Sequence, residues 1–222
     1  LTTNNISVIN RGIDTNYFNK PVDSTRRDQV VSTYQIDTAK KIILFPARMT
    51  SWKGQLEFID VIKKIDTQNI FVLFAGDTKN ERYTKLVRDK IKQNNLEGVC
   101  KILGSVNQDE MRSLYQVADL SVSFPLRAEG FGRTISESLY SKTPVLAFDY
   151  GGVKNQLVNL SDMFKVKPQD YQALPAKIEK LLSLSEVQKK EVIEGVQSFI
   201  ENNFSKINMV NQYLKLYESL KS

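Results

Sequence analysis

Two carboxylates and two glycines fall within one short segment of the chain, residues 124–137. Glu129 and Glu137 bracket its second half with seven residues between them, while Gly130 and Gly132 allow the backbone to approach a ligand closely. Backbone amides that open a helix just after these glycines would be free to bind phosphate, helped by the helix dipole. A phosphate at these amides, with carboxylate acceptors on either side for hydroxyl groups, would suit a nucleotide sugar.

Two cations lie in a second segment, residues 45–54, which also leaves an apolar run and enters an amphipathic one. Arg48 presents a planar fork and Lys53 a point charge, and together with free amides they suit a diphosphate. The alternative is that both are solvated surface charges. Lys53 and Gly54 do not form a Walker motif, because the glycines that such a motif needs upstream are lacking.

Each of these features also has an ordinary structural interpretation. Thr134 and Glu137 match a capping box, in which the glutamate only accepts a hydrogen bond from a backbone amide. The Gly151-Gly152 pair, which follows another apolar run, could hold a phosphate or sugar, or could make a tight turn. The functional interpretation depends on the conjunction: three glycine-marked loops that would meet at one edge of a sheet.

These loops need elements that position them, and apolar runs alternate with amphipathic stretches along almost the whole chain. Continuous apolar runs predict buried strands, and apolar residues at helical spacing predict helices. The predicted strands are residues 6–9, 41–45, 70–75, 99–103, 119–124 and 144–148. The predicted helices are residues 24–35, 54–66, 80–94, 107–118, 133–142, 168–184, 186–203 and 205–221. Asn107 and Glu110 predict a capping box at the start of the fourth helix.

Strands that are apolar on both faces and alternate with helices predict a parallel sheet covered on both sides. The predicted fold class is therefore α/β, a Rossmann-like, doubly wound domain that takes up residues 1–222 as a single unit. Ligands of such sheets bind beyond the carboxyl ends of the strands. The loops expected there are residues 46–54, 76–80, 104–107, 125–133 and 149–154.

The composition excludes several kinds of chemistry. The 222 residues contain no His and one Cys, which rules out a Ser-His-Asp or Cys-His nucleophile within the chain, the usual Cys/His zinc site and an internal disulfide. Cys100 is predicted to be a buried, small apolar residue. The net charge of +6 is spread along the chain and favours anionic ligands or anionic lipid surfaces. No run is long and apolar enough for a membrane helix.

Taken together, these residues resemble the C-terminal domain of a GT-B glycosyltransferase of glycosyltransferase family four, also called glycosyl transferases group 1. The family has a Glu, then Phe-Gly, then a second Glu eight positions after the first, with a Gly-Arg…Lys-Gly loop upstream and Pro-Val and Gly-Gly downstream. The matching residues are Glu129, Phe131, Gly132 and Glu137, then Arg48, Lys53 and Gly54, and then Pro144, Val145, Gly151 and Gly152. Residues 9–18 also resemble the family, so the resemblance covers essentially the whole chain.

The resemblance implies a domain that binds the nucleotide-diphosphate sugar of a glycosyltransferase that retains anomeric configuration. Arg48 and Lys53 would grip the diphosphate and stabilise the leaving group, and Glu129 would bind hydroxyls of the transferred sugar; these are the expected catalytic residues. Glu137 would bind the ribose hydroxyls. The other expected donor-binding residues are Gly104, Ser105 and Val106, near the base, and Gly130, Phe131, Gly132, Arg133 and Thr134.

The family needs no bound metal, so neither a metal nor a cofactor is expected. Fixed cations and helix amides would instead neutralise the charge that develops as the sugar–phosphate bond breaks. The departing phosphate could itself take the proton of the acceptor, which agrees with the lack of His. Three departures from the family pattern are Ala47 for Gly, Leu126-Arg127 for a small polar pair, and Lys154-Asn155 for Pro-Glu. The last departure removes a carboxylate that could contact the donor, so the identity of the donor is left undetermined.

The resemblance also implies an N-terminal half that holds the acceptor. Because the chain lacks an initiator Met and starts where the second half of the family starts, we expect it to be a fragment that is inactive alone. Residues 1–20 are expected to lead in from that half. Residues 205–222 are expected to form a C-terminal helix that reaches back toward it, and core packing is the other interpretation of that helix.

The expected partners are the nucleotide-sugar donor, the N-terminal half and an anionic membrane surface. The expected setting is cytoplasmic, at the inner face of the membrane, in the synthesis of lipopolysaccharide, other cell-envelope polysaccharide or glycolipid. Two other functions stay open: another GT-B enzyme, such as a sugar-nucleotide epimerase, and a non-catalytic sugar-nucleotide-binding module. No nucleic-acid partner is expected, because the sequence has no recognition motif and no stripe of positive charge.

Overall fold

The computed structural model describes residues 6–220 of the chain. At its centre is a six-stranded sheet in the order β3-β2-β1-β4-β5-β6, in which every pair of neighbours is parallel. The strands are β1 (Lys41–Pro46), β2 (Ile70–Ala75), β3 (Cys100–Gly104), β4 (Leu120–Ser123), β5 (Val145–Phe148) and β6 (Lys165–Val166). This strand order is that of a Rossmann fold, so the predicted α/β class is confirmed.

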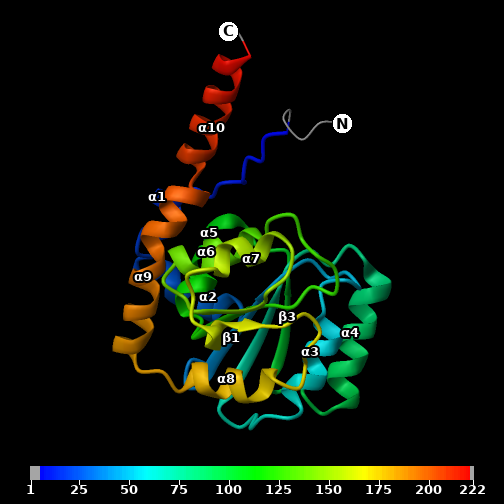
Figure 1. Ribbon diagram of the computed structural model, residues 1–222. Helices are drawn as coiled ribbons and strands as arrows, with labels where there is room; N and C mark the ends of the chain where they lie inside the picture. Colours follow the sequence, from blue (N-terminus) through cyan, green and yellow to red (C-terminus); the bar gives the residue numbers. More distant parts are fainter. Residues whose placement is uncertain (1–5, 221–222) are drawn as a thin grey trace.

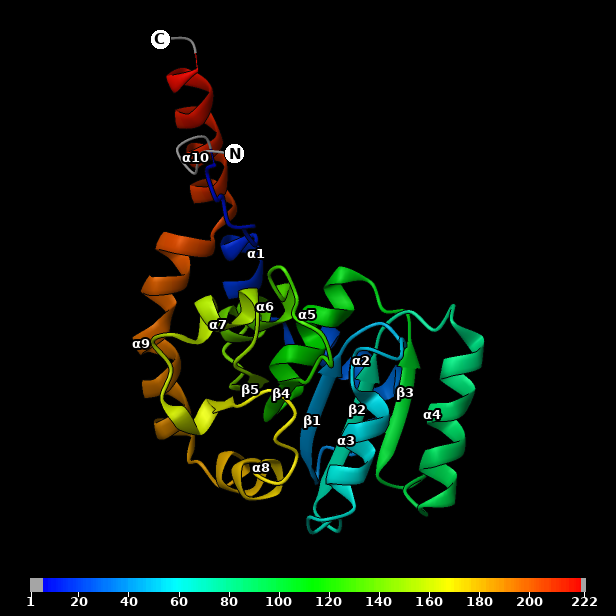
Figure 2. The ribbon, with the colours of Figure 1, turned by 45° about the vertical axis from the view of Figure 1, so that its right-hand side comes forward.

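Helices cover both faces of the sheet (Figures 1 and 2). Every residue of β2 and all but the first of β1 are buried, so both faces of these strands need apolar cover. On one face α3 packs against α4 and α8, and on the other α2 packs against α5, while α6 contacts β4 and β5. The helices are α1 (Thr15–Asn19), α2 (Ser24–Thr33), α3 (Gln55–Ile62), α4 (Glu81–Gln93), α5 (Gln108–Val117), α6 (Arg133–Tyr140), α7 (Gly152–Leu157), α8 (Leu174–Leu182), α9 (Glu186–Phe204) and α10 (Lys206–Ser219).

Five predicted strands and all eight predicted helices are present, most with ends within a few residues of those expected. The capping box of Asn107 and Glu110 at the start of α5 is confirmed. Cys100 is buried, as predicted, and burial raises the pKa of its thiol to about 12.

Some predicted elements are wrong or incomplete. Residues 6–9 form no strand, because no neighbouring strand pairs with them and Ile6 and Val8 are 69% and 82% exposed. The helix expected from residue 168 begins only at Leu174, where Pro175 falls in the first turn, the part of a helix that tolerates proline. The short elements α1, α7 and β6 were not expected.

A cluster of phenylalanines packs against the carboxyl-terminal half of the sheet. Phe45 of β1 contacts Phe58 of α3 and Phe74 of β2, with ring centres 5.4 Å and 5.6 Å away. Phe124, which follows β4, contacts Phe58 and Phe148 of β5 at 5.4 Å and 5.1 Å. All five rings are fully buried. Because Phe45 and Phe124 directly precede the two loops of interest, the cluster fixes the points from which those loops leave the sheet.

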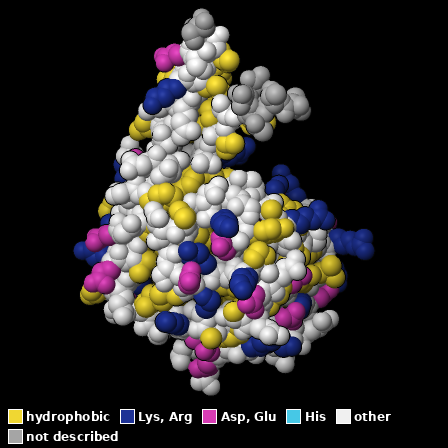
Figure 3. All heavy atoms as spheres, in the orientation of Figure 1, with side chains coloured by type: hydrophobic (Ala, Val, Ile, Leu, Met, Phe, Trp, Pro, Cys, Tyr) yellow, Lys and Arg dark blue, Asp and Glu magenta, His cyan; other side chains and the backbone are white. Residues whose placement is uncertain are grey.

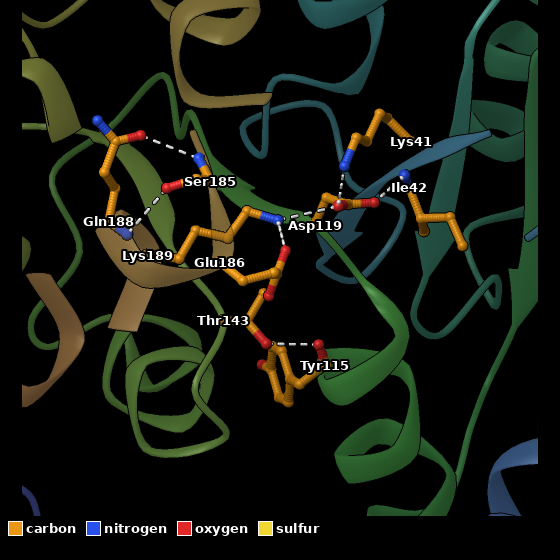
Figure 4. Close-up of polar contacts among 9 residues, drawn as sticks. All are labelled: Lys41, Ile42, Tyr115, Asp119, Thr143, Ser185, Glu186, Gln188 and Lys189. Atoms are coloured by element: carbon orange, nitrogen blue, oxygen red, sulfur yellow. Dashed lines mark hydrogen bonds and ion pairs between the residues drawn. The ribbon is translucent and has the colours of Figure 1, made fainter. Parts of the chain in front are cut away.

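The opposite, amino-terminal edge of the sheet is fastened by one carboxylate (Figure 4). Asp119, just before β4, accepts hydrogen bonds from the Ile42 backbone N–H at 2.9 Å, from Lys41 at 3.0 Å and from Lys189 of α9 at 3.1 Å. Burial opposes ionisation of Asp119, but these hydrogen bonds, led by that of Ile42, outweigh it and lower its pKa. Lys189 also pairs with Glu186 at 2.8 Å, so α9 is tied to the sheet through charges that satisfy one another.

Helix α10 projects away from the sheet (Figures 1 and 2). None of its described residues is buried, so core packing is the wrong interpretation of this helix. Apolar side chains along it are exposed, as the yellow atoms of the projecting arm in Figure 3 show; they include Ile207, Val210, Tyr213, Leu214 and Tyr217. Within residues 6–220, no helix is long and apolar enough to cross a membrane.

The segment before α1 is fastened to the junction of α9 and α10. The Ile13 N–H donates to the Phe204 carbonyl at 2.8 Å, and the Lys206 N–H donates to the Ile13 carbonyl at 2.7 Å. A side chain at Gly12 would lie 2.4 Å from the Ser205 carbonyl oxygen, so this close approach requires glycine. The segment that leads into the sheet and the helix that leaves it therefore meet at one place.

Candidate functional site

The candidate site lies where the strand order reverses, between β1 and β4. In open parallel sheets a crevice forms at this switch point, beyond the carboxyl ends of the strands. The loop after β1 and the loop after β4 meet there, since the Leu126 N–H donates to the Trp52 carbonyl at 2.7 Å. The predicted convergence of these two loops is confirmed.

Gly54 allows the first of these loops to enter α3 directly beside the second. Its φ of 86° lies in the left-handed region, and a Cβ there would lie 2.2 Å from the backbone oxygen of Phe124. Only glycine fits here without a shift of one of the two loop segments. The residue just before it, Lys53, is thereby held in the lining of the crevice.

The Lys53 ammonium forms an ion pair with the carboxylate of Glu129 and lies 4.3 Å from the centre of the Trp52 ring. The side chains of Lys53 and Glu129 are only 17% and 13% exposed, so water screens their attraction less than it would at the surface. The pair joins the two predicted segments through the charges that each supplies. The contact with the Trp52 ring further limits where the lysine ammonium can move.

The backbone of Arg48 is held by a hydrogen bond, whereas its guanidinium group is exposed. Its carbonyl accepts a hydrogen bond at 2.9 Å from the amide of Gln55, which is fully buried. Its side chain is exposed, and within residues 6–220 no carboxylate lies within ion-pair distance of the guanidinium. A positive charge that is positioned yet unneutralised at the edge of a crevice suits an anionic ligand.

The loop after β4 ends in an uncapped helix. Gly132, the N-cap of α6, has a φ of 76° and no side chain that could cap the helix, so the first amides of α6 lack the usual partner. In the described part of the chain, neither the Gly132 nor the Arg133 N–H donates to a protein acceptor. Free amides at a helix N-terminus form an anion site.

The glycine pair after β5 supports this loop from below. The Gly152 N–H donates to the Glu129 carbonyl at 2.7 Å, and a Cβ on Gly152 would lie 2.0 Å from the Gly130 oxygen. The structure favours the turn over a phosphate or sugar site for this pair. Gly151 is the N-cap of α7 and Gly152 its first residue, and both contact the loop after β4 without lining the crevice.

Glu137 is buried on α6, with 7% of its surface exposed. Its Oε2 accepts a hydrogen bond from the Tyr115 hydroxyl at 3.1 Å, and its Oε1 accepts one from Arg133 at 2.7 Å. Burial, followed by the charge of Glu137, raises the pKa of Tyr115 well above its ordinary value, so the hydroxyl stays a donor. The capping-box interpretation of Glu137 with Thr134 is wrong, since the N-cap of α6 is Gly132 and the Glu137 carboxylate pairs with side chains.

The loops and the segment before α1 enclose an open groove with a volume of about 870 Å³. Eight predicted residues line it: Arg48, Lys53, Glu129, Gly130, Phe131, Gly132, Arg133 and Thr134. The predicted residues Gly104, Ser105, Val106 and Glu137 do not. Gly104 ends β3 with its carbonyl bonded to the Gly76 N–H at 2.9 Å, and Ser105 beside it is exposed. The site roles assigned to these residues stay predictions.

Sequence reasoning missed six lining residues, which are Val8, Ile9, Asn10, Arg11, Trp52 and Ala128. Trp52 is the only tryptophan of the chain and sits next to the predicted Lys53, a signal that could have drawn attention to it. The other segment, residues 8–11, gives no such signal, because its position depends on the distant contact at the α9–α10 junction.

No group of three or more His, Cys, Asp or Glu residues in the described part of the chain is arranged to hold a metal ion. The expectation that the reaction needs no metal stays a prediction, because a donor diphosphate can bring its own ligands to a cation.

The chain is similar in sequence and in fold to several known proteins. The trehalose synthase of Thermococcus litoralis is 27% identical over 200 residues, covering 86% of this chain and 47% of that protein. The solved structure of a glycosyltransferase from Rickettsia africae ESF-5 is 29% identical, with a TM-score of 0.91 over 97% of this chain and 57% of the other. HepE from Anabaena, solved with UDP and glucose, shares the fold, with a TM-score of 0.83 over 96% of this chain and 57% of its own at 22% identity.

The chain spans about half the length of the curated relatives it matches. The family model for glycosyl transferases group 1 matches residues 27–198, more than three quarters of the chain. That range contains both loops of the groove, the ion pair between them and the glycine pair beneath. The chain therefore belongs to the glycosyl transferases group 1 family.

Proposed function

We propose that this chain is the donor-binding half of a glycosyltransferase that moves a sugar from a nucleotide-diphosphate sugar to an acceptor with retention of configuration. The observation that carries the proposal is the convergence, at one switch point, of Arg48, Lys53 and the free amides that open α6. Two cations and a helix N-terminus suit a diphosphate. HepE, which shares the fold, was solved with UDP and with UDP-glucose, and this supports a nucleotide-sugar donor.

The chemistry needs charge stabilisation at the leaving group. When the bond between the sugar and the β-phosphate breaks, negative charge grows on the departing diphosphate, and fixed cations and amides stabilise it without reorganising. Arg48 and Lys53 would supply the cations, and Gly132 and Arg133 the amides. In this proposal the departing phosphate takes the acceptor proton, so no His is needed as base in this half, which agrees with the lack of His in the chain.

Lys53 and Glu129 could pair with each other when no donor is bound and contact the donor when it is bound. Without donor, each charge neutralises the other in a partly desolvated place. A diphosphate would attract the Lys53 ammonium, and the released Glu129 carboxylate could then accept hydrogen bonds from hydroxyls of the sugar. Donor binding would thus replace one charge pair by two sets of ligand contacts.

The acceptor side of the proposal reaches beyond this chain. Because the chain spans about half of its relatives, we place the acceptor in the remainder of the protein and expect the isolated chain to be inactive. We further propose that the complete protein works in the cytoplasm at the inner membrane face, in the synthesis of lipopolysaccharide, other cell-envelope polysaccharide or glycolipid. The resemblance and the net charge of +6 support this setting. Liposomes of anionic lipid should bind the protein in a salt-sensitive manner, and failure to bind would contradict the membrane contact.

A thermal-shift panel tests the donor site. UDP, GDP, ADP and their sugar conjugates are each added at about a hundred times the dissociation constant, which adds about 2.7 kcal/mol to stability. For a chain of this length that corresponds to a shift of about 5–10 °C in Tm. Arg48→Ala should abolish the shift without changing the Tm of the free chain, because the Arg48 guanidinium is exposed and unpaired among residues 6–220.

Lys190→Ala is the matched control for this experiment. It removes an exposed cation on α9, far from the groove, and should leave the ligand shift unchanged. Absence of a shift with every nucleotide would contradict the proposed function, and an equal loss in both variants would contradict the role of Arg48.

A further inference from the structure

Gln156 on α7 is a polar side chain with no exposed surface, placed between the apolar residues Val153 and Leu157. Burying an amide is unfavourable unless its hydrogen-bonding groups are satisfied. All of its partners lie in or just after the loop that follows β4. No motif of the sequence singles out this residue, which lies just beyond the loop expected at residues 149–154.

Both ends of the amide are engaged. The Nε2 group donates to the Phe131 carbonyl and also, at 3.3 Å, to the Gly132 carbonyl. The Oε1 atom accepts a hydrogen bond from the Ser136 hydroxyl, one turn into α6. Gln156 thus draws two consecutive carbonyl groups of the loop toward the interior of the protein.

The direction of these carbonyls fixes the direction of the amides. In a trans peptide group the C=O and the N–H point in opposite directions, and the described peptide bonds are trans. The Phe131 carbonyl shares its peptide group with the Gly132 N–H, and the Gly132 carbonyl shares its group with the Arg133 N–H. When Gln156 holds the two carbonyls inward, the two N–H groups must point away from it. Gly132 and Arg133 line the groove, and within residues 6–220 neither amide has a protein acceptor.

We propose that Gln156 is a positioning residue that turns the Gly132 and Arg133 amides toward the donor diphosphate; the proposal rests on the proposed function. It acts through the backbone and touches no ligand. The packing around it agrees, because Gly132 has a φ of 76° and a Cβ there would lie 2.5 Å from a Val153 methyl carbon. The close contact of Gly132 with α7 restricts the conformation of the loop after β4, and Gln156 sets the orientation of the peptide groups at Gly132 and Arg133.

A pair of variants separates positioning from general stabilisation. Gln156→Met keeps an unbranched side chain of similar size and removes both N–H donors. Ser136→Ala removes the other hydrogen bond of the same amide and leaves the carbonyl contacts in place. Both changes should lower Tm. Only Gln156→Met should weaken binding of the nucleoside diphosphate, by about tenfold or more, since hydrogen bonds to charged groups are the strong ones.

The measurement is calorimetric titration of each folded variant with UDP, GDP and ADP and with the matching nucleosides. The proposal expects the loss in the diphosphates alone, because the nucleoside makes no phosphate contact. An unchanged diphosphate affinity in Gln156→Met overturns it, as does an equal loss for nucleoside and diphosphate or an equal loss in Ser136→Ala. If the unsubstituted chain binds no nucleotide, the proposed function fails and this inference fails with it.

A second measurement needs no substitution, so it decides the matter if Gln156→Met does not fold. In a ¹⁵N-labelled sample of the unsubstituted chain, the Gly132 and Arg133 amide signals should move on addition of the diphosphate that binds. The Gln156 side-chain NH₂ signals should exchange slowly with water in the same sample. Amide signals that stay in place, or a side-chain NH₂ group that exchanges freely, would overturn the proposal.

Discussion

The two edges of the sheet carry hollows of similar size but different chemistry. The groove at the carboxyl edge has a volume of about 870 Å³, and a hollow at the amino edge, lined by Lys41, Asp119 and Lys189 among others, has about 720 Å³. At the amino edge Lys41 and Lys189 share the Asp119 carboxylate (Figure 4), while Arg27 and Lys142, which also line the hollow, have no ion-pair partner among residues 6–220. At the carboxyl edge Arg48 has no carboxylate partner among residues 6–220, and two amides lack acceptors.

The difference shows that volume alone does not mark the site. At the amino edge Lys189, Asp119 and Glu186 fasten α9 to the sheet, so these three charges are already satisfied without a ligand. The carboxyl edge places charges and amides on glycine-dependent loops, where a ligand can complete them. Substitutions at the two edges should therefore separate stability from activity.

The largest effect is expected from Lys53→Met. In the complete protein this change should lower the rate of sugar transfer by about 100-fold or more, because it removes a cation that would stabilise the leaving group. Steady-state kinetics with the donor identified by the thermal-shift panel measures it. Lys189→Met is the matched control, since it also removes a mostly buried, ion-paired lysine, but at the other edge. Lys189→Met should reduce Tm and leave the rate of transfer by the folded protein within about twofold. Full activity of Lys53→Met would contradict the role of Lys53 at the leaving group.

The next effect concerns stability. Gly54→Ala should lower the free energy of unfolding by about 2–3 kcal/mol, because the residue has a φ of 86° and its Cβ would meet the Phe124 backbone. Gly98→Ala, at the amino edge just before β3, should change it by less than about 0.5 kcal/mol, since a Cβ there has open space. Urea denaturation of both variants measures the difference. Equal values for the two would show that the loop after β1 can shift without cost.

The smallest effect concerns pH. Asp119→Asn should lower the free energy of unfolding at neutral pH by about 1–2 kcal/mol, because it replaces the charged acceptor shared by two lysines. The pKa of Asp119 is lowered in the folded protein from the ordinary 3.8. Its contribution is therefore present above that value and is lost as pH falls through the lowered pKa. The difference between the variant and the unsubstituted chain should shrink below about pH 4.

The contribution of Lys189 to stability depends on pH in the opposite direction. Burial works against its charge, but Glu186 and Asp119 raise its pKa above 10.5, so its contribution is present below that value and is lost as pH rises through the raised pKa. Lys41→Met serves as the control, because Lys41 is 46% exposed and its ion pair should contribute less than about 1 kcal/mol. Urea titrations between acid and alkaline pH give the profile. A gap between Asp119→Asn and the unsubstituted chain that widens in acid would refute the assignment.

Much of the fold could be predicted because the buried strands are continuous apolar runs. Strands such as β2, residues 70–75, must be apolar on both faces, and this pattern is unambiguous. Residues 6–9 show the limit: Ile6 and Val8 repeat the apolar alternation of a strand, but pairing depends on a neighbour that the local pattern cannot supply. α7 and β6 are too short for a period to be visible.

The site divides in the same way. Arg48, Lys53 and Glu129 could be found because they lie beside glycines directly after predicted strands. Gln156 could not, because its importance comes from contacts 24 and 25 residues away in the chain, with Gly132 and Phe131. Glu137 was found for its spacing, but its pairing with Tyr115 depends on how α5 packs beside α6. Spacing reveals groups that would touch a ligand, and packing reveals those that hold them.

The contact between Ile13 and the α9–α10 junction has a consequence for protein engineering. Because the incoming and outgoing segments are bonded to each other, the body between residues 13 and 205 closes on itself at a single joint. A module whose ends adjoin can be exchanged between host proteins with little disturbance to either. Grafting this body into a related protein would then require the matching of one junction rather than two distant ones. Gly12, which allows the close approach, would have to be transferred with it.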